Sequence, residues 1–173
     1  MLKNKQVKKA KRGNNKAFQE LIQDEKDKLY RMAYLYVKNE NDALDIVQEA
    51  IYKAYISIKT LKEPQYFSSW LTRILINAAL DFIRKNRRVI PIDKIESMKN
   101  AWEVHTVEDN LDLVDAIDRL EEQYKTVVIL RYYKDFSIKQ IADTLSCPEG
   151  TVKTHLHRAI KQLRVDLKEG HTR

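Results

Sequence analysis

Few side chains in this sequence are spaced for catalysis or metal binding. Asp45 and Glu49 lie four residues apart, so on a helix they share one face, where paired carboxylates suit acid–base chemistry or a metal ion. No histidine or third carboxylate accompanies them at ligand spacing, and two ligands do not complete a metal site. His155 and His157 are two residues apart and point in different directions on a helix. The sequence therefore predicts no metal or cofactor site and leaves the acidic pair as a surface feature.

Nucleophilic and phosphate-binding patterns are missing as well. The single cysteine, Cys147, precedes a helix start, but no histidine is near it in sequence. The three glycines, Gly13, Gly150 and Gly170, form no phosphate-binding loop. The sequence therefore predicts no catalytic residue and no small-molecule substrate, which disfavours a helical enzyme.

The basic side chains offer binding chemistry instead. Residues 70–88 read WLTRILINAALDFIRKNRR, with apolar residues at helical spacing on one face and Arg73 and Asn77 on another. The last turn gathers Arg84, Lys85, Arg87 and Arg88. A helix that ends in cations and carries an amide midway suits contact with a phosphate backbone and a base. The alternative interpretation of this stretch alone is a solvated basic helix end.

A second basic helix stands near the C-terminus. Ser137 and Gln140 form a capping-box pattern for a short helix over 138–145, and Ser146-Cys147-Pro148 makes a turn before a long helix over about 149–167. Helix, tight turn and longer helix is the pattern of a helix-turn-helix, so we expect DNA binding. The side of the long helix opposite its apolar stripe carries Lys153, Thr154, His155, His157, Arg158, Lys161 and Arg164.

The elements that position these groups are predicted to be helices in two small domains. The chain has 173 residues with only three glycines and three prolines, so helices with short connections should dominate an all-α fold. Charge divides the chain: residues 1–13 carry +6, 14–88 carry +3, 89–109 carry −3 and 110–173 carry +1. We interpret these segments as a mobile basic tail over 1–13, a module over 14–88, a flexible acidic linker over 89–109 containing Trp102, and a module over 110–170.

Within the first module the pattern predicts helices over 17–37, with room for a break at 24–28, and over 42–58 with Asn41 or Asp42 as its N-cap. Pro64 keeps the connection over 59–66 from being helical throughout. No apolar run is long enough to span a bilayer, and the N-terminus lacks the apolar segment of a signal peptide. One cysteine fits a reducing cytoplasm, where we expect the protein to act.

Read together, two stretches resemble a known family. DALDIVQEAIYKAY followed by WLTRILINAALDFIRKNRR resembles region 2 of the extracytoplasmic-function sigma factors of bacterial RNA polymerase. TVVILRYYKDFSIKQIADTLSCPEGTVKTHLHRAIKQLR resembles their region 4, and both stretches stand in the family's order and spacing. The resemblance covers about residues 14–88 and 110–168, and within the family the chain is similar to sigma-V-like members.

The resemblance implies a role for each stretch. Asp45, Gln48 and Glu49 match the residues that bind the clamp helices of the polymerase largest subunit, and region 4 is expected to bind the flap of the second subunit. Asn77 matches the asparagine that lines the pocket for a flipped base of the −10 promoter element, and residues 59–66, with Lys62, match the loop that reads that base. The matching −35 contacts are Lys153, Thr154, His155, His157, Arg158 and Lys161.

The linker with Trp102 is expected to thread toward the active-site cleft of the polymerase. The family also implies a membrane-anchored anti-sigma factor, which would hold the protein at the membrane until release lets it act at the nucleoid. Glu121 stands where the family often has proline, which predicts a longer preceding helix, and Pro148 occupies the usual N-cap of the recognition helix. The alternative function is a stand-alone helix-turn-helix regulator that binds a palindrome as a symmetric dimer without polymerase.

Overall fold

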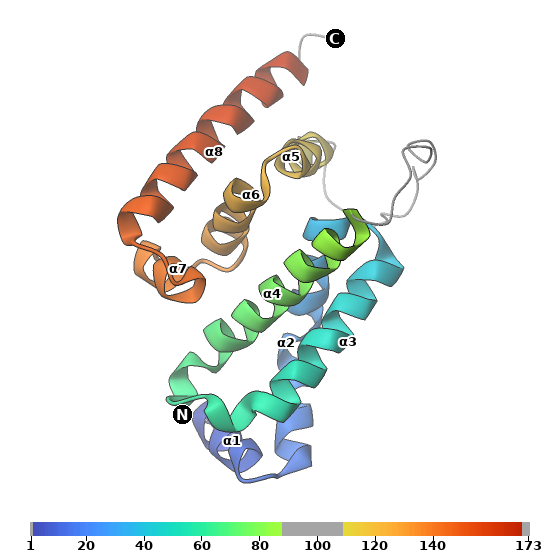
Figure 1. The fold of residues 1–173 in the computed structure, drawn as a ribbon, viewed down its shortest axis with the longest axis vertical. Coiled ribbons are helices and arrows are strands. Elements are labelled where there is room, and N and C mark those ends of the chain that lie inside the picture. Colours follow the sequence, from blue (N-terminus) through green and yellow to red (C-terminus); the bar gives the residue numbers. More distant parts are fainter. Residues whose placement is uncertain (1, 88–108, 171–173) are drawn as a thin grey trace.

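A computed structural model describes residues 2–87 and 109–170, and every regular element in these two stretches is helical, as predicted (Figure 1). Arg88, Trp102 and all but the last residue of the predicted linker lie outside the described residues. Arg87 ends a helix, but its side chain also lies outside the description.

The first module is a bundle of α2 (Asn15–Val37), α3 (Glu40–Ser57) and α4 (Phe67–Arg87), with α1 (Leu2–Lys11) packed on α2. The stripe predicted for 70–88 faces this core, because Leu71 and Leu75 are almost fully buried. Between α3 and α4 run two short turns, η1 (Ile58–Thr60) and η2 (Pro64–Tyr66), so the proline does interrupt the helices. The α2 helix continues through 24–28 without the break that the sequence allowed.

Two predictions for this module are wrong. Residues 2–11 form α1 instead of a mobile tail, because Val7 and Ala10 give the lysine-rich segment a small apolar face that is buried. The N-cap of α3 is Asn39 instead of Asn41 or Asp42. Asn39 has extended backbone, and its side chain accepts a hydrogen bond from the Asp42 amide at 3.0 Å, so the helix begins at Glu40.

The second module contains α5 (Asp109–Asp118), α6 (Glu122–Val128), a single π-helical turn η3 (Ile129–Tyr133), α7 (Ile138–Leu145) and α8 (Glu149–Gly170). The capping box is confirmed: Ser137 Oγ accepts from the Gln140 amide, and the Gln140 side chain accepts from the Ser137 amide. Ser146 ends α7 in the left-handed region at φ 54°, and the amides of Thr151 and Val152 donate to the Pro148 carbonyl at the start of α8.

The longer helix predicted from Glu121 is not found. The α5 helix stops at Asp118, and Glu121 is instead the N-cap position of α6, without a hydrogen bond from its own side chain to the helix end. The Tyr124 and Lys125 amides donate to the Glu121 carbonyl. The chain therefore turns at 119–121 even without proline.

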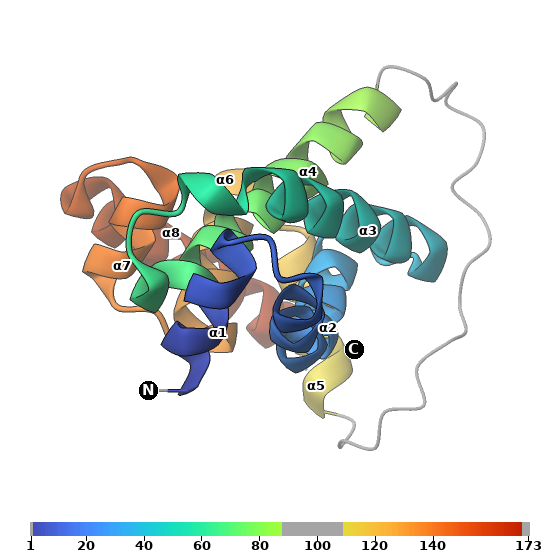
Figure 2. The same cartoon turned by 90° about the horizontal axis from the view of Figure 1, so that it is seen from below.

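The two modules pack against each other (Figures 1 and 2), with α7 beside α4 and α5 beside α2. Buried residues of the first module and Val127, Leu130, Ile141 and Leu156 of the second belong to one hydrophobic cluster. Tyr36 Oη donates a hydrogen bond to Thr126 Oγ1 at 2.8 Å inside this contact, and burial raises the Tyr36 pKa. The two modules therefore share one hydrophobic core, and a smaller separate cluster of Leu120, Val128 and Ala159 lies within the second module.

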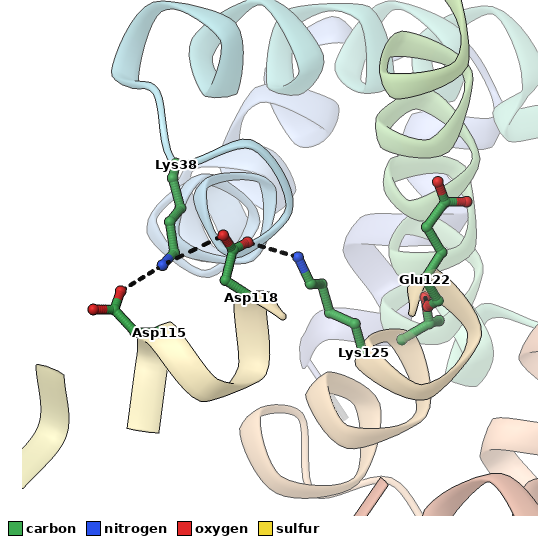
Figure 3. Close-up of polar contacts among 6 residues, drawn as sticks. Lys38, Asp115, Asp118, Glu122 and Lys125 are labelled. Atoms are coloured by element: carbon green, nitrogen blue, oxygen red, sulfur yellow. Dashed lines mark hydrogen bonds and ion pairs between the residues drawn. The ribbon is translucent and has the colours of Figure 1, made fainter. Parts of the chain in front are cut away.

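Ion pairs surround the core contact. Lys38, the left-handed C-cap of α2, lies 2.7 Å from Asp115 and 3.6 Å from Asp118 of α5, and Lys125 of α6 binds Asp118 at 2.8 Å (Figure 3). A further ion pair joins the modules, because buried Glu25 of α2 lies 3.6 Å from Lys134, which follows η3.

Candidate nucleic-acid interface

The basic face of α4 is open to solvent. Arg73, Asn77 and Arg84 fall on one side of the helix, and all three are exposed. Arg84 lies 3.8 Å from Asp81, a pair too exposed to hold its guanidinium in place. Lys85 lies on another side, where it lines a shallow groove with Asp45 and Glu49 of α3. The structure thus brings Arg73, Asn77 and Arg84 together and separates Lys85 from them.

A pocket of about 460 Å³ lies where residues 60–66 meet the start of α4. We call it the loop pocket. Lys62 is exposed at its edge, and two aromatic side chains, Tyr66 and Trp70, line it beside Arg73. Its volume is within the range of small-ligand sites, and the aromatic rings suit stacking with a flat base. The resemblance included Tyr66 only as the last residue of the loop over 59–66 and gave no role to the ring of Trp70, although aromatic residues at the edges of a polar loop signal such a surface.

The loop pocket is partly closed by the second module. Gln140, Asp143 and Thr144 of α7 form the remaining wall. Beside the pocket, Arg73 donates a hydrogen bond to Ser146 Oγ in the helix-turn-helix turn at 2.8 Å. Arg73, which is predicted to bind −10 DNA, therefore contacts the turn of the motif that is predicted to bind −35 DNA.

The outer side of α8 is the second basic surface, which we call the α8 face. It consists of five exposed residues on the side away from the core: Lys153, Thr154, His157, Arg158 and Lys161. Thr154 Oγ1 donates back to the Gly150 carbonyl. Arg158 Nη1 lies 3.4 Å from Tyr124 Oη, and this contact raises the pKa of Arg158, which stays fully charged. The face presents donors and cations in the arrangement that a DNA major groove accepts.

His155 is placed differently from the other predicted α8 contacts. It is half-buried, and its ring stands edge-on to Tyr124 with centroids 5.5 Å apart. It lines a groove between the modules together with Arg84 of α4. The structure therefore sets His155 apart from the α8 face.

A third surface lies on α3, and we call it the α3 face. Asp45, Gln48 and Glu49 are exposed, as predicted from the helical pattern, and Glu49 pairs with Lys53 at 3.2 Å. Tyr52 and Ile56 continue the same side of the helix and are 62% and 60% exposed. Sequence reasoning left both out of the candidate surface, although their phase on the helix was readable. Exposed apolar side chains rimmed by polar groups mark protein–protein interaction sites.

Other chemistries find little support in the part of the chain that the structure describes. No group of three or more metal-binding side chains gathers within residues 2–87 and 109–170. In the same two stretches, none of the helices has the length and apolar character needed to cross a membrane. Cys147 is half-buried in the turn before α8, and its neighbours in the groove include His155, which sequence spacing had not suggested.

Comparisons with known proteins place the chain in a family. A family model described as "Sigma-70 region 2" matches residues 21–89, and one described as "Sigma-70, region 4" matches residues 110–163. The chain is 43% identical over 148 residues to RNA polymerase sigma factor SigV of Bacillus subtilis, covering 84% of this chain and 88% of the relative. It is 32% identical over 184 residues to ECF RNA polymerase sigma factor SigW of the same organism, covering 98% of each.

Two solved structures share the fold. CnrH, solved in complex with the cytosolic domain of CnrY, superposes with a TM-score of 0.75 at 20% identity, covering 98% of this chain and 99% of that one. The sigma factor RpoE of Bartonella quintana, solved in complex with the anti-sigma factor NepR, gives a TM-score of 0.73 at 24% identity, covering 88% and 98%.

Proposed function

The chain belongs to the extracytoplasmic-function group of the sigma-70 family and directs transcription initiation by RNA polymerase, and we propose that it divides this task among three surfaces. The α3 face binds core polymerase, the α4 helix with the loop pocket captures the −10 strand, and the α8 face reads the −35 duplex. The observation that carries the proposal is that these surfaces differ in chemistry: one is acidic and apolar, one is basic and aromatic, and one is basic with mixed donors.

The α3 face is suited to a protein partner. Asp45, Gln48 and Glu49 supply charge and hydrogen-bond acceptors, while Tyr52 and Ile56 supply apolar area that binding would bury. We assign this face to the clamp helices of the polymerase largest subunit. Region 4 is assigned to the flap of the second subunit.

The −10 assignment rests on the loop pocket and the basic side of α4. Stacking of a captured base on an aromatic ring contributes about 1–3 kcal/mol, and Tyr66 and Trp70 offer two rings. Asn77 supplies an amide for a base edge. The remaining side chains assigned to this strand are cations that contact its phosphates: Lys62, Arg73, Arg84, Lys85, Arg87 and Arg88.

Magnitudes explain why a polymerase-binding surface is needed. Opening base-pair steps costs about 1.4 kcal/mol each, so a −10 bubble costs on the order of 10 kcal/mol. Extruding a base adds a few kcal/mol. One pocket and a few phosphate contacts do not offset that sum, so the polymerase has to share the work. Reading an intact −35 duplex with the α8 face carries no such cost.

Strand capture requires a rearrangement of the two modules. The α7 helix forms a wall of the loop pocket, and the Arg73 guanidinium is already hydrogen-bonded to Ser146 Oγ. We therefore infer that a DNA strand reaches the pocket only after α7 moves away from α4. We infer that promoter binding by the holoenzyme separates the modules. The groove that holds both Arg84 and His155 would open in the same step, freeing His155 for the −35 contact that the family pattern assigns to it.

An anti-sigma factor is the further partner that family membership favours. We propose a membrane-anchored inhibitor that keeps the protein from polymerase until it is released. The protein would then act in the cytoplasm, at the nucleoid.

Core binding is tested with a double charge reversal. Asp45→Arg with Glu49→Arg should weaken binding to core polymerase at least tenfold in a fluorescence-anisotropy titration, because two repulsive charges replace two attractive ones. Asp24→Arg with Asp27→Arg reverses two exposed carboxylates of α2 and should leave affinity unchanged. Equal affinity of the α3 double variant and the wild type would refute the assignment. Tight binding of a palindrome by the chain alone, as a dimer with no gain from core polymerase, would favour the stand-alone regulator.

A further inference from the structure

The basic α1 helix packs against the segment that forms the loop pocket. It contacts α2 and both short turns, η1 and η2, which lie between α3 and α4 (Figure 2). Val7 is fully buried and Ala10 nearly so, although the helix carries five lysines. A helix with so little apolar area stays docked only if other contacts help to fix it.

Gln6 of α1 donates a hydrogen bond to Glu20 of α2, and two lysines on the side of the helix that carries Val7 supply further contacts. Lys3, Val7, Ala10 and Lys11 recur at the spacing of one helix face. Lys11 Nζ donates a hydrogen bond to the carbonyl of Leu61, which stands between the two turns. Lys3 Nζ lies 5.8 Å from the ring centroid of Phe67, the first residue of α4. One helix therefore holds both ends of the segment 61–67.

The other lysines of α1 do not share this role. Lys5, Lys8 and Lys9 are exposed on the remaining sides of the helix. Basic composition alone would suggest a general attraction to nucleic acid, whereas the geometry singles out Lys11 and Lys3 for contacts within the protein. The two kinds of lysine can be separated by substitution.

The segment that α1 holds has little support of its own. Between Ile58 and Phe67 the backbone hydrogen bonds close short turns, such as the Leu61 amide to the Ile58 carbonyl at 3.2 Å and the Tyr66 amide to the Glu63 carbonyl at 3.1 Å. Leu61 is buried, and its neighbours Lys62 and Tyr66 carry the pocket-lining groups. Recognition of a base needs such groups held to within about 0.5 Å, which isolated turns do not provide.

We propose that α1 is a positioning element for the loop pocket and that Lys11, through the Leu61 carbonyl, is its principal positioning residue. Removing that hydrogen bond lets residues 59–66 shift, so the pocket fits a correct and an incorrect base more equally. The inference rests on the proposed capture of a −10 base by this pocket. It assigns base discrimination partly to a lysine that does not touch DNA.

The test compares three variants of the full chain in holoenzyme. Lys11→Met removes the donor, Lys11→Arg restores a donor, and Lys8→Met removes the same charge from the exposed side of α1. Each holoenzyme is titrated with premelted promoter DNA carrying either the preferred base or a substitute at the flipped position. The preference for the correct base should fall about threefold to tenfold in Lys11→Met, the fold-change of one hydrogen bond. It should recover largely in Lys11→Arg and stay at the wild-type value in Lys8→Met.

A second measurement separates two outcomes: that the loop pocket does not capture a base, and that α1 does not position the pocket. Amide hydrogen exchange over 59–66 is followed in the free chain, without DNA. Faster exchange there in Lys11→Met than in Lys8→Met supports the positioning role even if the wild type shows no base preference, a result that would refute base capture itself. Equal exchange in the two variants would overturn the inference. Where the wild type does prefer the correct base, an unchanged preference in Lys11→Met or an equal loss in Lys8→Met would also overturn it.

Discussion

Glu25 offers the sharpest test of how the modules are held together. Its carboxylate, 5% exposed, accepts a hydrogen bond from Lys3 Nζ at 2.5 Å and lies 3.6 Å from Lys134 Nζ, whose side chain is 6% exposed. Burial raises the Glu25 pKa, but the hydrogen bond from Lys3 and the charges of Lys134, Lys3 and Lys28 outweigh it, so the pKa is lowered. Burial likewise lowers the Lys134 pKa, with only partial compensation by Glu25. The Glu25 carboxylate thus interacts with several cations.

Glu25→Gln therefore leaves a buried cation without its counter-charge. Breaking a buried ion pair by removing one partner costs about 3–5 kcal/mol, and the 3.6 Å separation from Lys134 places the expected loss near the lower end, at about 3 kcal/mol. Adding Lys134→Met should recover at least half of the loss, because the unpaired charge is then gone. Lys3→Met should cost about 1 kcal/mol, since Lys3 is 43% exposed.

The assay is urea unfolding at pH 7, with Asp24→Asn as an exposed control on the same helix that should change stability by less than about 0.5 kcal/mol. The effect also depends on pH. Because the folded-state pKa of Glu25 is lowered, its stabilising contribution is full above its unfolded-state value of about 4.3 and is lost as pH falls through the folded-state value. An unchanged midpoint for Glu25→Gln, or a double variant no more stable than the single one, would refute the reasoning.

Three further predictions follow from named contacts. Arg158→Ala should weaken binding to a −35 duplex by about 1–3 kcal/mol for the preferred sequence if Arg158 makes a bidentate base contact. Lys161→Ala should weaken binding equally across sequences. The same dependence of affinity on sequence in the two variants would contradict the assignment. Ser137→Ala removes the capping box and should cost about 1 kcal/mol in urea unfolding, with Ser68→Ala, inside α4, as the control. Tyr36→Phe removes the buried hydrogen bond to Thr126, so it should cost about 1 kcal/mol and raise the radius of gyration by small-angle scattering; an unchanged value of both would count against the role of this contact.

The parts of the fold that sequence predicts well depend on local pattern. The apolar stripe of α4, the capping box at Ser137 and the turn before α8 are encoded within a few residues each, so periodicity and cap chemistry suffice. The cap of α3 is harder, because Asn39, Asn41 and Asp42 are all good N-caps. The extended backbone of Asn39, which the sequence does not specify, decides among them.

What sequence misses depends on partners far along the chain. The α1 helix is stabilised because Val7 is buried where α1 packs on α2 and Lys11 donates to the Leu61 carbonyl. The lysine-rich segment does not by itself predict these contacts. Glu25 and Lys134 read as ordinary surface charges until the fold buries them together. The same holds for the candidate surfaces. Helical phase predicts that Arg73, Asn77 and Arg158 are exposed, whereas the loop pocket and the half-burial of His155 depend on how the two modules pack.

The central claim is that promoter opening relies on α4 and the loop pocket, and its most direct measurement is permanganate reactivity of −10 thymines in the holoenzyme–promoter complex. Asn77→Ala is compared with Asn86→Ala, since both asparagines are exposed on α4 and Asn86 has no assigned contact with the promoter. The reactivity should drop severalfold in Asn77→Ala, while core affinity and −35 binding stay at wild-type values, and it should remain unchanged in Asn86→Ala. Equal reactivity in the two variants would contradict the account.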